Sequence, residues 1–121
     1  MENIVVWFDI PVKNLQRAMK FYHQVLTLDL QKQEQAPVPM AFFPFAPGVA
    51  SGALVESTET KPGRQGATVY LNAGKDLAIP LAKVEKSGGK VLQEKTSIGP
   101  HGYIAYVEDT EGNRIGLHSM N

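Results

Sequence analysis

The sequence predicts an α+β domain made of two βαβββ modules that face each other around a cleft. Two observations indicate this fold. The same order of elements, one strand, one helix and three strands, occurs twice along the chain. A polar stretch at 58–65 separates the two runs and is expected to be an exposed linker. One helix covers only one face of its module's sheet, so two modules gain stability by burying their uncovered faces together.

The composition is that of one globular domain, expected to span 1–121. Hydrophobic residues make up 43% and charged residues 20% of the 121 positions, which is enough to build a core. Twelve basic residues balance twelve acidic ones, so no basic field attracts nucleic acid or an anionic membrane. The absence of cysteine excludes disulfides and thiolate chemistry. Because the sequence shows no secretory leader pattern and no long apolar run, we expect a cytoplasmic protein.

The first module is expected at about 3–57. It begins with a strand over Ile4–Pro11, which is rich in β-branched and aromatic residues. A helix follows from the Asn14 cap to about Leu26, because apolar residues recur there at helical spacing. Three further strands are predicted, over Leu28–Glu34, Met40–Phe45 and Ala50–Glu56.

The second module is expected at about 66–121. A strand over Thr68–Ala73 leads to a helix from Asp76 to about Ser87, which ends at two glycines. Pro80 lies in the first turn of this helix, where proline is tolerated. The remaining strands are predicted over Lys90–Glu94, Gly102–Glu108 and Arg114–Ser119. A shift of 62 residues places Asn14 on Asp76, which indicates an internal duplication.

Three segments carry a resemblance to a known family. Phe8–Tyr22 has a strand followed by a capped helix with a Phe-Tyr pair, and Gly88–Leu92 matches in the second half. Glu108–Leu117 is similar to a D-P-x-G-N turn followed by an I-x-L strand, with Thr110 where proline is commoner. These segments resemble the vicinal oxygen chelate superfamily of glyoxalase I, extradiol dioxygenases and bleomycin-resistance proteins. The chain is most similar to bacterial predicted enzymes related to lactoylglutathione lyase. The resemblance implies the glyoxalase/bleomycin resistance/dihydroxybiphenyl dioxygenase-like fold.

The resemblance also implies four metal-ligand positions, which in the metal-dependent relatives are usually His or Glu. They fall on Trp7, at or next to Glu56, on Thr68 or Val69, and on Gly116. Of these only Glu56 is a good ligand for a divalent ion, and one carboxylate does not make a site. We therefore expect no metal and no other cofactor. Glyoxalase I and extradiol dioxygenase activities, which need the ion as a Lewis acid or as a binding centre, are disfavoured.

Candidate cleft-lining residues come from both modules, and none is assigned a catalytic role. An indole at Trp7 can stack on a planar ligand or fill the space of the missing metal. His118 lies two residues past Gly116 and therefore on the same strand face, either as a base or displaced ligand or as a solvated strand end. Tyr70, Tyr103 and Tyr106 are ordinary strand residues whose hydroxyls can reach a ligand, and none of them is a signature. The full set of candidates is Trp7, Asp9, Phe43, Glu56, Thr68, His101 and His118.

The leading hypothesis is a protein that holds a small, partly apolar molecule in the cleft without a metal, either as a resistance-type binder or as an enzyme. The rival is a metal-dependent lyase or dioxygenase with a rearranged ligand set that includes Glu56 and His118. A third hypothesis is a structural dimer module whose cleft is vestigial. We expect a homodimer, because so short a chain has few ways to cover every sheet edge and apolar face. Whether the cleft forms within one chain or across the dimer is left open.

Overall fold

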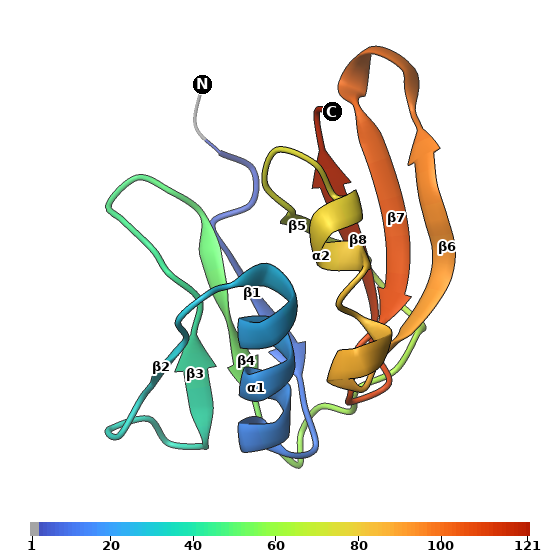
Figure 1. The fold of residues 1–121 in the computed structure, drawn as a ribbon. Helices are drawn as coiled ribbons and strands as arrows, with labels where there is room; N and C mark the ends of the chain where they lie inside the picture. The colour runs from blue at the N-terminus through green and yellow to red at the C-terminus, as the bar shows by residue number, and fades with distance from the viewer. Residues whose placement is uncertain (1–2) are drawn as a thin grey trace.

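The computed structural model describes residues 3–121 and contains two four-stranded sheets that lie side by side (Figure 1). The first sheet runs in the order β1 (Trp7–Pro11), β4 (Ser51–Val55), β3 (Met40–Phe42), β2 (Gln31–Lys32). The second runs in the order β5 (Val69–Asn72), β8 (Arg114–Ser119), β7 (Tyr103–Glu108), β6 (Lys90–Ser97). In each sheet the first and last strands of the module pair in parallel and the other neighbours are antiparallel. The predicted α+β fold of two βαβββ modules is confirmed.

The first helix, α1 (Leu15–Leu26), forms as its sequence predicts. The Asn14 side chain accepts a hydrogen bond from the backbone N–H of Arg17 at 3.0 Å and so caps the first turn. A buried stripe covers the sheet and consists of Leu15, Ala18, Phe21, Tyr22 and Val25. The helix ends at Thr27, which has a left-handed backbone with φ of 57°.

The second module's helix is much shorter than the predicted span from Asp76 to Ser87. It consists of α2 (Ala78–Leu81), followed by irregular turns and the 3₁₀ turn η1 (Glu85–Ser87). Past Ala82 the hydrogen bonds tighten, since the N–H of Lys83 bonds the carbonyl of Pro80 at 3.0 Å. A second 3₁₀ turn, η2 (Gly99–His101), follows β6.

Some strands also differ from the prediction. The three residues before Trp7 lie outside β1, and Ile4 is 96% exposed. The strand expected at Leu28–Glu34 is reduced to Gln31–Lys32, whereas β6 extends past the expected end to Ser97. Within residues 3–121, no helix is long and apolar enough to cross a membrane.

The modules meet through the sides of the sheets that carry the helices, so the expectation that they bury their uncovered faces together is wrong. Helix α1 contacts both α2 and η1, and a single core cluster combines Ile10 and Leu54 of the first sheet with Leu71 and Leu117 of the second. In Figure 1 both helices lie on the near side of their sheets. We call the opposite, helix-free sides the open faces. Strand alternation puts Ile10 in the core and Trp7 and Asp9 on the open face of the first sheet.

The turn between β7 and β8 fastens the modules together. The Tyr22 hydroxyl donates to the buried Asp109 carboxylate at 2.6 Å, and the Asn113 side-chain amide donates to the carbonyl of Pro11 at 2.7 Å. Glu111 accepts from the backbone N–H groups of Lys13 and Asn14, each at 2.8 Å. We call this turn, residues 109–113, the module joint. The family-like motif is thus a structural element, because its Asp109, Glu111 and Asn113 side chains bond residues of the first module.

Candidate functional site

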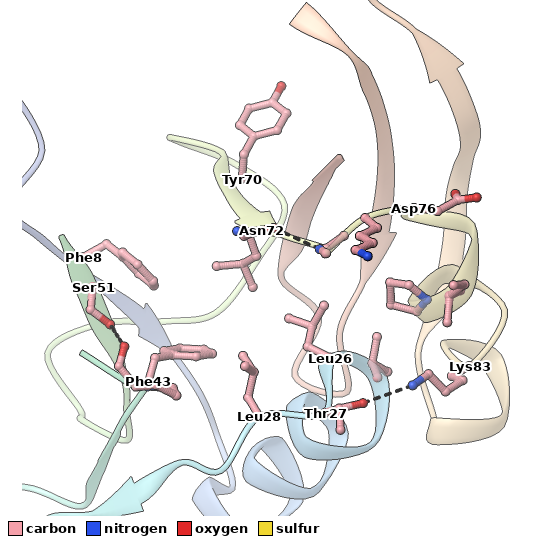
Figure 2. A pocket seen from close by; sticks show the side chains of 18 of the residues that line it. Phe8, Leu26, Thr27, Leu28, Phe43, Ser51, Tyr70, Asn72, Asp76 and Lys83 are labelled. Carbon is pink, nitrogen blue, oxygen red and sulfur yellow. Dashed lines mark hydrogen bonds between the residues drawn. The ribbon is translucent and has the colours of Figure 1, made fainter. Parts of the chain in front are cut away.

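Two hollows lie against the sheets, and Tyr70 of β5 lines both of them. The inter-module groove has a volume of 790 Å³ and takes its walls from both modules, with Phe8 and Phe43 on one side and Asp76 and Lys83 on the other (Figure 2). The open-face hollow has a volume of 610 Å³ and is lined by the second module alone. Its residues are Tyr70, Gln93, Thr96, Ile98, His101, Ile104, Tyr106 and His118.

A pair of tyrosines dominates the open-face hollow. The hydroxyls of Tyr70 and Tyr106 are hydrogen-bonded at 2.5 Å, and this bond raises the pKa of Tyr70. The Tyr70 ring lies against Gly116, where an added Cβ would come within 2.4 Å of it. Glycine at this position therefore makes room for the ring. The guanidinium of Arg114 lies 3.8 Å from the centre of the Tyr106 ring and donates to the Thr68 hydroxyl at 2.8 Å.

The two predicted histidines come together at the same hollow. The Nε2 atom of His118 lies 2.7 Å from the backbone carbonyl oxygen of His101. A carbonyl oxygen can only accept, so Nε2 carries the proton and Nδ1 is the acceptor of the neutral ring. His118 therefore offers one nitrogen for a ligand or a proton, next to the two tyrosines.

The open face of the first sheet is aromatic and uncovered. Trp7 packs edge-on against Phe42 with ring centres 5.0 Å apart, and Phe42 packs against Phe45 at 5.8 Å. The indole N–H of Trp7 donates to Asp9 at 3.2 Å. Trp7 remains 39% exposed and Phe45 62% exposed. Large apolar side chains gathered on one surface are typical of a binding or interaction face.

Trp7 and Asp9, expected in a cleft between the uncovered sheet faces, lie on the open face of the first sheet, and Asp9 also lines a small hollow of 90 Å³ with Asn113 and Arg114. The side chain that enters the groove from β1 is Phe8, because neighbouring residues on a strand point to opposite faces. Phe43 does line the groove, but it is only 5% exposed and its ring packs 5.6 Å from that of Tyr22. It is chiefly a core residue.

Glu56, a candidate for cleft or metal, serves the helix instead. Its Oε1 atom accepts the backbone N–H of Leu15 at 2.8 Å, so the carboxylate caps α1 on the helix side of the sheet. The second module has an equivalent bond, in which Ser119 accepts the N–H of Leu77 at 2.9 Å. The sequence spacing gave no indication of this capping role.

The residues at the implied metal-ligand positions do not fit a metal. Glu56 is used as a cap, and Gly116 lies beneath the Tyr70 ring. Val69 pairs with the buried Ile115, so of the two alternatives only Thr68 belongs to the open face. The Thr68 hydroxyl already accepts a hydrogen bond from Arg114. Across the described chain, no group of three His, Cys, Asp or Glu side chains could hold an ion.

The comparisons with known proteins agree with this architecture. The model of the Glyoxalase/Bleomycin resistance protein/Dioxygenase superfamily matches residues 4–117. A glyoxylase-like domain-containing protein of Didymella fabae is 34% identical over 111 residues, which cover 87% of this chain and 84% of that protein.

Two solved structures show the same fold at low sequence identity. A glyoxalase I mutant from Zea mays superposes with a TM-score of 0.73 at 21% identity, covering 94% of this chain and 46% of that one. A fosfomycin resistance protein from Listeria monocytogenes superposes with a TM-score of 0.72 at 13% identity, covering 100% and 93%. At these identities the likeness concerns the fold alone.

Proposed function

Because the chain belongs to the glyoxalase/bleomycin resistance protein/dioxygenase superfamily, we propose that it is a metal-independent homodimer that binds a small, partly apolar molecule on its open faces. One observation carries the proposal. The open faces hold aromatic and hydrogen-bonding side chains that the single chain leaves uncovered, including Trp7, Phe45 and Tyr70.

The two open faces supply complementary halves of a binding site. The first offers aromatic rings at Trp7, Phe42 and Phe45, against which a planar ligand can stack. The second offers the hydroxyls of the tyrosine pair and His118. Pockets of this kind, mostly apolar with a few placed polar groups, are typical small-molecule sites. A second copy of the chain can bring the two halves together.

Dimerisation is tested by placing a charge on the aromatic open face. Phe45→Glu should yield a particle with the mass of one chain in light scattering, whereas the parent should have twice that mass. Ile79→Glu is the matched control, because Ile79 is 65% exposed but lies on α2, away from the open faces. A parent protein that is monomeric at micromolar concentration, or a dimer that survives Phe45→Glu, would refute the homodimer.

Metal independence is supported by the residues at the implied ligand positions, because Trp7 and Gly116 offer no ligand atom and Glu56 caps α1. Elemental analysis of the purified protein should find far less than one equivalent of Zn, Ni, Mn or Fe per chain. The methylglyoxal–glutathione hemithioacetal should not be turned over, because the Lewis acid worth several kcal/mol of barrier is missing.

The rival hypothesis of a metal-dependent lyase or dioxygenase makes the opposite prediction. It requires Glu56 and His118 to share an ion, yet Glu56 caps α1 and His118 binds the carbonyl of His101. If the protein holds one equivalent of metal per chain and either Glu56→Ala or His118→Ala loses it, the metal-dependent hypothesis is supported and the metal-free proposal is wrong.

A further inference from the structure

The inter-module groove lies on the helix side of the sheets and shares Tyr70 with the open-face hollow. It lies at the C-terminal end of α1, where residues 26–28 form part of one wall and Ile79 and Pro80 of α2 form part of the other. Its lining is mostly apolar and includes Phe8, Leu28, Phe43, Leu71, Ala73 and Pro80. Its volume of 790 Å³ lies within the usual range for small-molecule pockets.

The rim of the groove is positively charged. Lys75 and Lys83 both line it, and neither forms an ion pair within residues 3–121. Lys83 reaches across the groove to the Thr27 hydroxyl at 3.3 Å, a bond visible in Figure 2. The one acidic lining residue, Asp76, is already paired with Lys95 at 2.9 Å and with the N–H of Ala78 at 2.9 Å.

We propose that the groove binds a small amphipathic anion, an alkyl or aryl carboxylate. The apolar body lies against Phe8 and Phe43, and the carboxylate lies between the ammonium groups of Lys75 and Lys83. Charge complementarity selects an anion, because the rim holds two cations whose charge no carboxylate of the described chain neutralises. This site shares Tyr70 with the open-face hollow but none of Trp7, Phe45 and His118, and it adds to the function proposed for the open faces.

Calorimetric titration with octanoate and octylamine tests the charge preference, because the two probes have the same tail length and opposite head charges. Octanoate should bind the parent protein at least tenfold more tightly than octylamine, a difference expected from one favourable charged contact. Equal affinities, or no heat with octanoate at millimolar concentration, would overturn the proposal.

Variants locate the site. The double variant Lys75→Met, Lys83→Met should weaken octanoate at least tenfold while the circular dichroism spectrum is unchanged, and Ala50→Trp should block the groove. Lys86→Met, on η1 and outside the groove, is the matched control and should bind like the parent. Phe45→Glu should also leave octanoate binding intact. Octanoate binding that survives the lysine double variant, or that disappears in Phe45→Glu, would contradict a groove site.

Discussion

The two modules share one topology but differ in how well their sheets are covered. In the first, α1 has 12 residues and buries a full apolar stripe, whereas in the second α2 has four residues and tightens into 3₁₀ turns. The strand pairing is the same in both, with the first and last strands parallel. The difference shows that the same strand pairing is compatible with covering helices of different length.

The unequal covering has a functional consequence. The inter-module groove lies between the end of α1 and α2, and the open faces lie where no helix covers the sheets. The first open face is aromatic, around Trp7 and Phe45, and the second is polar, around Tyr106 and His118. Two modules of the same topology thus present two surfaces with different chemistry.

The largest expected effect concerns the joint that holds the modules together. Asp109 is 3% exposed and accepts from the Tyr22 hydroxyl and from the backbone N–H groups of Glu111 and Asn113. Asp109→Ala leaves these donors without their acceptor and should lower the free energy of unfolding by roughly 3–5 kcal/mol. Urea denaturation measures this loss of free energy.

Asp29→Ala, at a side chain that is 95% exposed, is the control and should change the free energy of unfolding by less than about 0.5 kcal/mol. Equal effects would show that the modules do not depend on the joint.

A smaller effect is expected from the titration of Glu111. Burial alone would raise its pKa, but hydrogen bonds from Arg17, from the N–H groups of Asn14 and Lys13 and from Thr110 lower the pKa below its ordinary value of 4.5. A lowered pKa in the folded state contributes stability above pH 4.5, and this contribution is lost as pH falls through the folded value.

Denaturant unfolding as a function of pH measures that contribution. Glu111→Gln should be less stable than the parent at pH 7 by about 1–3 kcal/mol, and the difference should narrow on acidification below pH 4.5. Asp29→Asn provides the control for removing one exposed carboxylate. If the stability difference between the parent and Glu111→Gln stays constant from neutral to acidic pH, the ionised Glu111 carboxylate does not stabilise the module joint.

The smallest expected losses of stability concern the side chains that cap the two helices, Glu56 in the first module and Ser119 in the second. Ser119→Ala removes the acceptor of a buried bond to Leu77, and Glu56→Ala removes the acceptor of a partly buried bond to Leu15. Both should cost about 1–2 kcal/mol, with the larger loss at Ser119 because water cannot replace its bond. Glu56→Gln retains an oxygen acceptor and should recover most of the loss. Thermal unfolding measures the stability of all three variants. If Ser119→Ala unfolds at the same temperature as the parent, the two caps are not equivalent.

The sequence was sufficient to predict the fold because hydrophobic periodicity and turn residues are local properties. The Asn14 cap, the glycine stop at Gly88 and the hairpin before Arg114 all lie where they were predicted. The length of the second helix was overestimated, since its apolar spacing continues past the residues that keep α-helical hydrogen bonds.

The site was harder to predict, because which side of a strand faces the helices depends on tertiary packing. Trp7 and Asp9 lie on the predicted strand but not in the groove between the modules. The role of Glu56 depends on a backbone N–H 41 residues away in sequence. The Tyr70–Tyr106 pair became recognisable only through the strand register, which places Gly116 between them. The glycine at Gly116, which pairs with a tyrosine on each neighbouring strand, is the sequence feature that could have indicated the tyrosine pair.

The fluorescence of Trp7 tests the central claim, that a second copy covers the open faces, most directly. Trp7 is the only tryptophan of the sequence and is 39% exposed in the single chain. We expect a shielded, blue-shifted emission at micromolar concentration, which moves to the red on dilution and is red-shifted from the start in Phe45→Glu. An emission maximum and an acrylamide quenching constant that stay the same at every concentration, and in Phe45→Glu, would contradict a covered open face.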